Sequence, residues 1–282
     1  MSEVLRSAPA APARVDTDRP SAARMYDWFL GGTQNWAVDR EFGRKVERVW
    51  PHIRIVAKQN RQFMNRVVRH ALDAGIRQFV DLGSGEPTIG NVHEVVRRHL
   101  PRGQRARVAY VDYEPISVVH STAMLDQDRA QDWATVAQHD LRDVPGVLAD
   151  RDIRRLIDFS KPVCLLMIAV LHFLGDDDRP GDLVRAYRDE LAPGSWLGLS
   201  HIASDEAEPV GKIQIERFGE AYQKTTNPLW VRDREEIEGW FDGWELVRPG
   251  FVHLPDWRPE RRVTETEAEG RPFAWCGVGE KH

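Results

Sequence analysis

The sequence predicts one α/β domain whose central sheet is parallel except for its final strand, and three observations support this. Apolar runs of strand length alternate with helical patterns between residues 78 and 202. The first run ends in a glycine-rich loop that leads into a helix, as nucleotide-type α/β sites do. The last two runs, 244–252 and 272–280, are joined by a charged loop without a helical pattern, so we expect them to pair antiparallel.

The composition fits a single large globular domain. The chain has 282 residues, 41% hydrophobic and 29% charged, which is enough for a well-filled core. Its formal net charge is −5 and its basic residues are scattered, so we expect no nucleic acid partner. No apolar run approaches the ~20 residues of a membrane-spanning helix. Cys164 and Cys276 lie in apolar runs, which predicts buried thiols in a reducing cytoplasm rather than a disulfide or a metal site.

The chain divides into a tail and one domain. Residues 1–19 are charged, rich in Ala and Pro and without an apolar signal core, so we expect a disordered tail. Residues 20–282 form the domain, with a helical lid and a lead-in helix in 20–75 and the sheet core in 76–282. The lead-in helix covers 51–74, where apolar residues fall on one stripe. The sequence gives no indication of the oligomeric state.

The first segment that we expect to be ordered begins near Pro20 and is unusually rich in large apolar side chains. It concentrates five large side chains just before the glycine pair Gly31-Gly32: Met25, Tyr26, Trp28, Phe29 and Leu30. One interpretation is a helix that packs on the core with the glycines as its C-cap. The other is a lid over a ligand, in which Tyr26 and Gly31 belong to the binding site and Arg24 meets a carboxylate of the ligand.

The glycine loop follows the first strand, 78–82. Gly83, Ser84 and Gly85 form a turn that lets the backbone pass close to a ligand. A nicotinamide fingerprint needs a third glycine where this chain has Thr88. The strand also places the acid Asp81 beside the loop, which disfavours a pyrophosphate and suits the ammonium group of S-adenosylmethionine (SAM). An ordinary strand-to-helix turn is the alternative.

Acids recur at the ends of the next two strands. The second strand, 107–112, ends at Asp112, which can accept hydrogen bonds from both ribose hydroxyls, with Tyr113 against the adenine ring. The alternative for Asp112 is a helix N-cap. The third strand, 134–138, leads to Asp140, whose carboxylate can accept the adenine amino proton, and to Leu141, whose backbone amide faces a ring nitrogen. A turn residue is the alternative for Asp140.

The fourth and fifth strands bring two histidines to the same edge. The fourth, 162–170, is apolar throughout, as expected at the centre of a sheet, and delivers Ala169 and then His172. The fifth, 195–202, delivers His201. These histidines are the evident candidates for removing a proton from a methyl acceptor, although each also has a purely structural interpretation. An inserted helix around 206–226 then interrupts the alternation, and insertions at this point build acceptor pockets.

The same residues carry a resemblance to a known family. The run PSAARMYDWFLGGTQNWAVDR, with QNRQFMNRVVR, QFVDLGSGEPT, NVHEVV, YVDYEP and AVLHFL after it, resembles a family of SAM-dependent methyltransferases long catalogued as a domain of unknown function. The resemblance spans Pro20 to Val278. It implies a class I methyltransferase, Rossmann-like fold with a seven-stranded sheet and SAM as cofactor, but no known acceptor. Glu86 departs from the family pattern, in which we expect an apolar residue.

The sequence therefore predicts a SAM-dependent methyltransferase that acts on a small molecule. Because the donor methyl group is already activated, the protein would mainly hold the acceptor in line and exclude water. A SAM-binding regulatory or carrier protein without catalysis is the first alternative. A nicotinamide-dependent reductase is the second, against which Thr88 and the antiparallel final pair both count.

Overall fold

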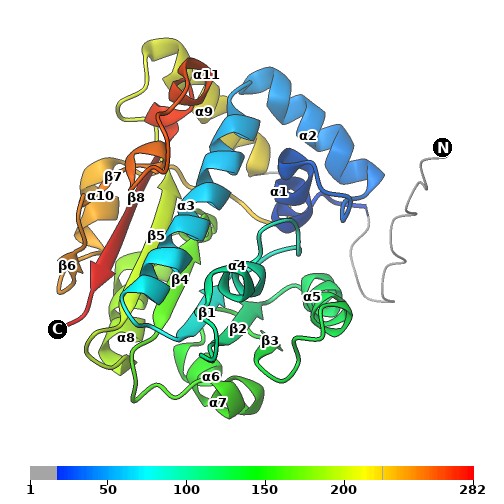
Figure 1. Ribbon diagram of the computed structural model, residues 1–282. Coiled ribbons are helices and arrows are strands. Elements are labelled where there is room, and N and C mark those ends of the chain that lie inside the picture. Colours follow the sequence, from blue (N-terminus) through cyan, green and yellow to red (C-terminus); the bar gives the residue numbers. More distant parts are fainter. Residues whose placement is uncertain (1–17, 224) are drawn as a thin grey trace.

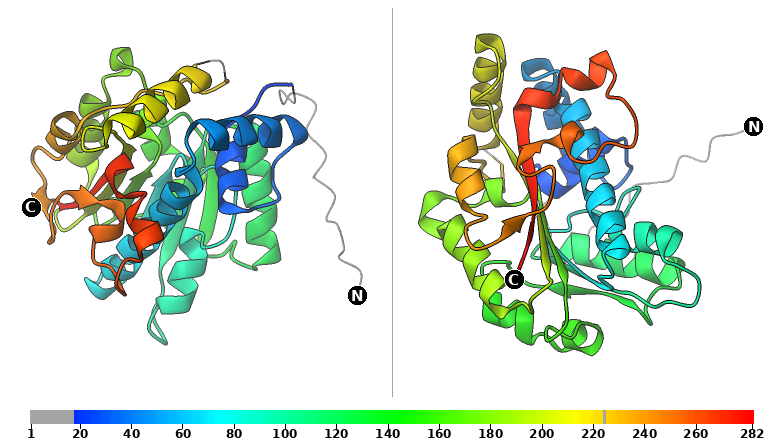
Figure 2. Two further views of the ribbon diagram at one scale, coloured as in Figure 1. Left: turned by 90° about the horizontal axis from the view of Figure 1, so that it is seen from above. Right: turned by 60° about the vertical axis from the view of Figure 1, so that its left-hand side comes forward.

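The structure is a computed structural model that describes residues 18–223 and 225–282. Most of the predicted tail, residues 1–17, lies outside the described residues. The domain is a twisted sheet with helices on both faces, and the right view of Figure 2 shows the sheet between them. Neighbouring strand residues alternate between two cores, since Phe79 packs with Phe63 of α3 (Ile53–Asp73) and Val80 packs with Leu183 of α8 (Pro180–Glu190). Both faces of the sheet are therefore buried.

The sheet has the predicted topology. Five parallel strands lie in the order β3-β2-β1-β4-β5, and β8 pairs antiparallel with β5. The bounds are β1 Gln78–Leu82, β2 Arg107–Asp112, β3 Ala134–Gln138, β4 Cys164–Ile168, β5 Trp196–Ile202 and β8 Ala274–Glu280. The antiparallel final pairing confirms the expectation from residues 272–280.

The predicted sixth strand, 244–252, is two short strands. β6 (Glu245–Leu246) and β7 (Val252–His253) each pair antiparallel with β8. Between them the chain turns, with the Gly250 amide donating to the Val247 carbonyl at 3.0 Å. The described residues thus form eight strands where the sequence predicted seven, because a turn interrupts one apolar run.

The helices follow the predicted alternation. The long helix predicted for 51–74 is α3, and the inserted helix is α9 (Pro209–Tyr222). The others are α1 Ala22–Leu30, α2 Ala37–Val49, α4 Val92–His99, α5 Pro115–Gln127, α6 Val144–Ala149, α7 Arg151–Leu156, α10 Arg234–Gly239 and α11 Glu265–Ala268. In Figure 1, α1, α2 and α9 lie beyond the end toward which the parallel strands point. Among the described residues, no helix is both long and apolar enough to cross a bilayer.

The N-terminal helix α1 belongs to the hydrophobic core. Met25 and Phe29 are fully buried against α3, so the interpretation as a helix packed on the core is correct. The helix ends at Gly31, which has a φ of 84° and donates its amide to Trp28 O at 3.0 Å, as expected for a glycine C-cap. Both cysteines are buried free thiols, as predicted.

Candidate active site

A cavity of about 430 Å³ lies at the carboxyl edge of the parallel strands. Strand ends, the segment after β3 and helices α1, α3 and α9 line it, which is where open α/β sheets bind ligands. Its volume is in the usual range for small ligands, ~300–1,000 Å³. Most of the predicted cofactor residues line this cavity: Tyr26, Asp81, Gly83, Ser84, Gly85, Asp112, Tyr113, Asp140, Leu141 and Ala169.

The glycine loop has the backbone that only glycine adopts easily. Gly83 and Gly85 have φ values of 68° and 67°. A Cβ on Gly83 would lie 2.2 Å from Cγ2 of Val170, so this glycine is required by packing as well as by φ. A Cβ on Gly85 would meet Ala23 of α1 at an ordinary 3.7 Å. Both glycines were expected to leave space for a ligand, whereas at Gly83 the space is limited by Val170 of the protein itself.

Three carboxylates line one end of the cavity. Asp112 accepts backbone hydrogen bonds from Gly85 at 2.7 Å and Glu114 at 2.9 Å, which fixes the loop after β1 to the end of β2. Burial raises the pKa of Asp112 to about 6 and that of Asp81 to about 7. Burial likewise raises the pKa of Glu114 to about 7, although the Ser21 hydroxyl donates to this carboxylate. This end of the cavity is acidic and partly desolvated.

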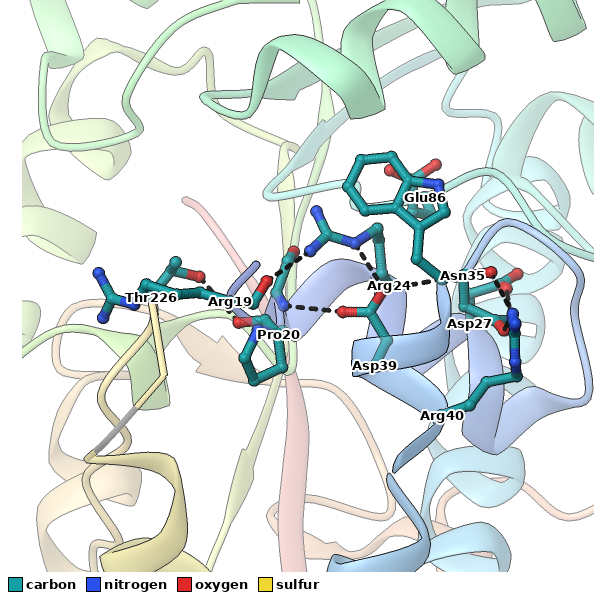
Figure 3. Close-up of polar contacts among 12 residues, drawn as sticks. Arg19, Pro20, Arg24, Asp27, Asn35, Asp39, Arg40, Glu86 and Thr226 are labelled. Carbon is teal, nitrogen blue, oxygen red and sulfur yellow. Dashed lines mark hydrogen bonds and ion pairs between the residues drawn. The ribbon is translucent and has the colours of Figure 1, made fainter. Parts of the chain in front are cut away.

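The cation beside Asp81 is Arg61 rather than Arg24. Arg24 lies near Glu114, and its charge opposes the rise that burial causes in the pKa of that carboxyl. Arg24 does not line the cavity, which corrects the sequence prediction. Its Nε is paired with buried Asp39 at 2.7 Å (Figure 3). Its guanidinium lies over the Trp36 ring. Arg61 of α3 lines the cavity, and its Nε is buried with no hydrogen-bond partner among the described residues. Its charge lowers the pKa of Asp81, in opposition to the larger effect of burial.

Helix α1 forms a wall of the cavity. Tyr26 and Phe29 line it, whereas Gly31, predicted to belong to the binding site, does not. Gly31 only ends the helix. Trp28 also turns away and donates to Glu47 at 3.0 Å. The segment therefore both packs on the core and borders the site.

A hydrogen-bond chain ties α1 to the strand ends. The Tyr26 hydroxyl donates to Ala57 O at 3.1 Å and accepts from Asn60 Nδ2 at 2.9 Å. Asn60 Oδ1 accepts from the Ser200 hydroxyl at 2.5 Å, and Ser200 Oγ accepts from the Ala169 amide at 3.0 Å. Ala169 has a φ of 53°, a conformation that costs about 1–3 kcal/mol in a non-glycine residue. The sequence analysis missed Asn60, although an amide on the apolar stripe of a helix was a visible signal.

The two candidate catalytic histidines lie side by side, with ring centroids 5.4 Å apart. Burial lowers the pKa of His172 to about 3 and holds that of His201 well below its usual range, so both are neutral at pH 7. His201 donates Nδ1–H to Ile202 O at 2.7 Å, and Arg232 lies 3.5 Å from its Nε2. His172 differs, because its Nδ1 is buried without a partner among the described residues.

The predicted adenine side is formed by residues after β2 and β3. Tyr113 is half-exposed, and its hydroxyl contacts the Asn227 amide. Asp140 accepts from Nε of Arg142 at 3.0 Å, and this bonding holds the pKa of Asp140 below its usual range. Leu141 lines the cavity next to it. The acid is therefore ionised but shared with an arginine that the sequence analysis did not consider.

Glu86, at the position where we expected an apolar residue, does not line the cavity. Its buried carboxylate accepts from the Ser117 hydroxyl at 3.0 Å and contacts His120 Nδ1 at 2.6 Å. These partners are on α5, so Glu86 anchors the glycine loop to that helix. Glu86 acts on the cavity only through its charge, which adds to the effect of burial in raising the pKa of Asp112 and of Glu114.

Two distant segments meet at the rim of the cavity, as Figure 3 shows in part. Residues 19–22 precede or begin α1, and residues 225–227 follow α9. They are joined by Arg19 Nη2 to Thr225 O at 2.8 Å, Thr226 Oγ1 to Pro20 O at 3.2 Å and Ala22 N to Asn227 Oδ1 at 3.0 Å. These bonds close one side of the site.

The acidic end fits SAM and does not fit a dinucleotide. Asp81, Asp112 and Glu114 face the cavity together, so a pyrophosphate there would meet like charges in a poorly solvated environment. A ligand with an ammonium and a sulfonium group would instead be attracted, and a ribose would find carboxylate oxygens as acceptors.

Comparison with known proteins also indicates a site for SAM. A family model described as S-adenosyl methyltransferase matches residues 8–282. A candidate methyltransferase from Thermobifida fusca is 36% identical, with a TM-score of 0.83 over 94% of this chain and 96% of that one. A DUF574 family protein from Streptomyces avermitilis is 33% identical, with a TM-score of 0.85 over 95% of this chain and 100% of that one.

A more distant structure shares the fold. The SAM-dependent methyltransferase SibL has a TM-score of 0.52 at 15% identity, over 91% of this chain and 61% of that one. No curated protein matches the chain. The matched family model covers nearly the whole sequence, and the acidic cavity agrees with it. The chain therefore belongs to the S-adenosyl methyltransferase family, and it is a SAM-dependent methyltransferase.

Proposed function

We propose that the protein transfers the methyl group of SAM to a small molecule held in the same cavity. The observation that carries this proposal is the mixed lining of the cavity. Carboxylates at the ends of β1 and β2 make one part acidic, and α1, α3 and α9 contribute mainly apolar side chains. The bonds between residues 19–22 and 225–227 close one side, which favours a compact acceptor over a macromolecule.

We assign the cofactor contacts residue by residue. Asp112 would hold the ribose hydroxyls, and Tyr113, Asp140 and Leu141 would border the adenine. Asp81 would face the ammonium group. Arg61 would meet the carboxylate, because it is the cation beside Asp81 and its Nε lacks a partner among the described residues.

The chemistry divides between cofactor and protein. SAM, when bound, supplies a methyl group that is already activated on a sulfonium sulfur. The protein holds the acceptor in line with that group and excludes water. Tyr26 and Phe29 of α1 exclude water from their side of the cavity. The hydrogen bonds from Tyr26 through Asn60 to Ser200 fix α1 to the strand ends.

SAM binding is expected to release protons near pH 6.5. The pKa values of Asp81 and Asp112 are raised to about 7 and 6, and a cationic ligand favours their ionised forms. Affinity should therefore rise between pH 5 and 7.5, by up to about tenfold per pH unit for each group. Calorimetry in two buffers of different ionisation enthalpy measures the released protons. 5′-Methylthioadenosine, which keeps the ribose but lacks the ammonium group assigned to Asp81, should release fewer, and equal release would contradict the assignment of Asp81.

Asp112→Ala should weaken SAM binding by about 1.5–3 kcal/mol, because charge-assisted hydrogen bonds to the ribose are lost. The glycine loop should also loosen, since Asp112 accepts the Gly85 amide. Calorimetry at pH 7.5 gives the affinity, and thermal unfolding shows whether the variant is folded. Asp132→Ala, at an exposed acid before β3, is the matched control. Unchanged affinity in folded Asp112→Ala would remove this residue from the site.

The proposal that the acceptor is a small molecule can be tested with SAM that is labelled on its methyl group. The enzyme is incubated with SAM labelled on its methyl group and an extract of its source organism, which is then separated by ultrafiltration. Label should pass into the filtrate as a product other than SAM. Label found only in protein or RNA would overturn the proposal while leaving the methyltransferase activity established.

A further inference from the structure

We infer that the end of the cavity bounded by α1, α3 and α9 binds an uncharged, aromatic small molecule that carries a hydroxyl group, and that His172 contacts this hydroxyl. This inference rests on the proposed function, because it names the acceptor class for the same cavity.

The wall of this end, here called the aromatic wall, consists of five rings: Phe29, Trp50, Phe173, Phe218 and Tyr222. Four of them pack on one another, with centroids 4.9 Å apart for Trp50 and Phe218 and 4.6 Å apart for Phe218 and Tyr222. Tyr222 also stacks with Phe173 at 6.2 Å. Aromatic surfaces of this kind bind planar rings by offset and edge contacts. Aliphatic side chains add to this surface, among them Ile53, Val56, Met64, Leu229 and Leu254.

Among the described residues, the charged side chains that line the cavity come from elements other than α1, α3 and α9, with one exception. The charged side chains that line the cavity are Arg61, Asp81, Asp112, Glu114, Asp140, Arg142 and Asp178. Apart from Arg61, which lies beside Asp81, they lie at the ends of β1 and β2 or in the segments after β2, β3 and β4, and α1, α9 and the loop after α9 contribute none. Arg232, whose charge adds to burial in lowering the pKa of His172, does not line the cavity and is paired with Asp176 at 2.8 Å. An ionised acceptor would therefore lose its hydration there without gaining a free partner, so a neutral molecule is favoured.

Two polar groups within this apolar surface lack partners. Nδ1 of His172 and Nε1 of Trp50 are both buried and have no hydrogen bond to another described residue. Buried polar groups almost always find a partner, so an occupant with its own polar atoms would satisfy them once the rings turn toward the cavity. A hydroxyl suits His172, since it can donate to a neutral imidazole.

His172 is better placed than His201 for this contact. Both ring nitrogens of His201 already face protein groups, Ile202 O and Arg232. His172 follows the strained Ala169 by three residues, and its neighbour Phe173 belongs to the aromatic wall. The residue therefore lies where the strand end meets the aromatic wall. Because burial keeps it neutral, its ring retains a lone pair for the hydroxyl proton.

The reaction balances with these groups. The acceptor oxygen forms a bond to the methyl carbon as the carbon–sulfur bond breaks, and the sulfur keeps that electron pair. The hydroxyl proton becomes acidic as the new bond forms and leaves through the His172 ring to water. The products are a neutral methyl ether and S-adenosylhomocysteine.

Three naphthalene probes test the subsite in enzyme saturated with S-adenosylhomocysteine at pH 7.5. They are 2-naphthol, 2-naphthoate and 2-methoxynaphthalene. Calorimetry should show 2-naphthol binding about tenfold more tightly than the anionic 2-naphthoate, which would lose its hydration. 2-Naphthol should also bind about fivefold more tightly than 2-methoxynaphthalene, which cannot donate a hydrogen bond. Equal binding of 2-naphthoate, or no probe binding while S-adenosylhomocysteine binds, would overturn the inference.

His172→Phe separates a contact from a structural role. The variant keeps a ring and loses the nitrogens, so it should bind 2-naphthol and 2-methoxynaphthalene equally, with SAM affinity within about twofold of the wild type. An equal loss of affinity for all three probes would mean that His172 only supports the fold, and would overturn its contact with the hydroxyl group. His172→Gln, which keeps an acceptor atom, should recover part of the preference if the contact is real.

The labelled product of the extract experiment tests the same class independently. A neutral aromatic ether should pass from water at pH 7 into ethyl acetate. A small labelled product that stays in water would overturn this inference and leave the proposed small-molecule function intact, whereas label only in macromolecules would overturn both.

Discussion

Replacing Gly83 by alanine is expected to reduce SAM affinity by about 100-fold or more and to lower the free energy of unfolding by about 2–4 kcal/mol. A Cβ at this position would lie 2.2 Å from Val170 Cγ2, and the residue has a φ of 68°. Either the loop or Val170 must shift, and both belong to the cavity lining. Calorimetry with SAM and denaturant unfolding measure the two effects.

Two variants separate the causes of this loss. Gly103→Ala is a matched control, because Gly103 also has a positive φ, 82°, but a Cβ there would meet nothing within 4 Å. It should cost only the conformational penalty of about 1–2 kcal/mol and leave SAM binding unchanged. The double variant Gly83→Ala with Val170→Ala should recover part of the affinity. Wild-type binding by Gly83→Ala would show that the loop does not hold the cofactor.

Arg61→Ala should weaken SAM binding by about 30- to 100-fold, because a charge-assisted pair with the carboxylate is lost. The same variant should bind 5′-methylthioadenosine as the wild type does, since that ligand has no amino-acid part. Calorimetry with both ligands gives the comparison. Arg61→Lys keeps the charge and should retain part of the SAM affinity.

Comparing SAM with 5′-methylthioadenosine distinguishes a direct contact between Arg61 and the cofactor from a role of Arg61 in packing. Arg61 also lies near the Tyr26 ring, 5.6 Å from its centroid, so its removal could disturb the wall formed by α1. Such a disturbance would weaken both ligands equally. That result would reject Arg61 as the carboxylate partner.

Much of the sheet and of the acidic end could be predicted from the sequence. Parallel strands bring their carboxyl ends to one edge, so an acid at the end of each run is enough to place Asp81 and Asp112 together. The five parallel strands were predicted because buried strands are apolar throughout and are bounded by turn residues. The turn inside 244–252 was missed because apolar residues continue on both sides of it.

Pairings between side chains distant in the chain were beyond the sequence. Arg24 was assigned to the ligand because its partner Asp39, on the next helix, could not be identified from spacing. Arg61 was overlooked because periodicity shows which face of a helix is apolar, but not how the helix is rotated against a cavity. Glu86 was predicted to affect the loop, whereas its partners on α5 remove it from the site.

The position of β8 within the sheet has a consequence for how the protein is made. β8 lies between β5 and the short strands β6 and β7, yet it follows all of them in the chain. Until residues 274–280 leave the ribosome, β5 has a free edge and β6 and β7 have no partner. An exposed edge of this kind invites pairing with other chains. A prematurely terminated product should therefore aggregate during synthesis rather than persist as a weakened enzyme.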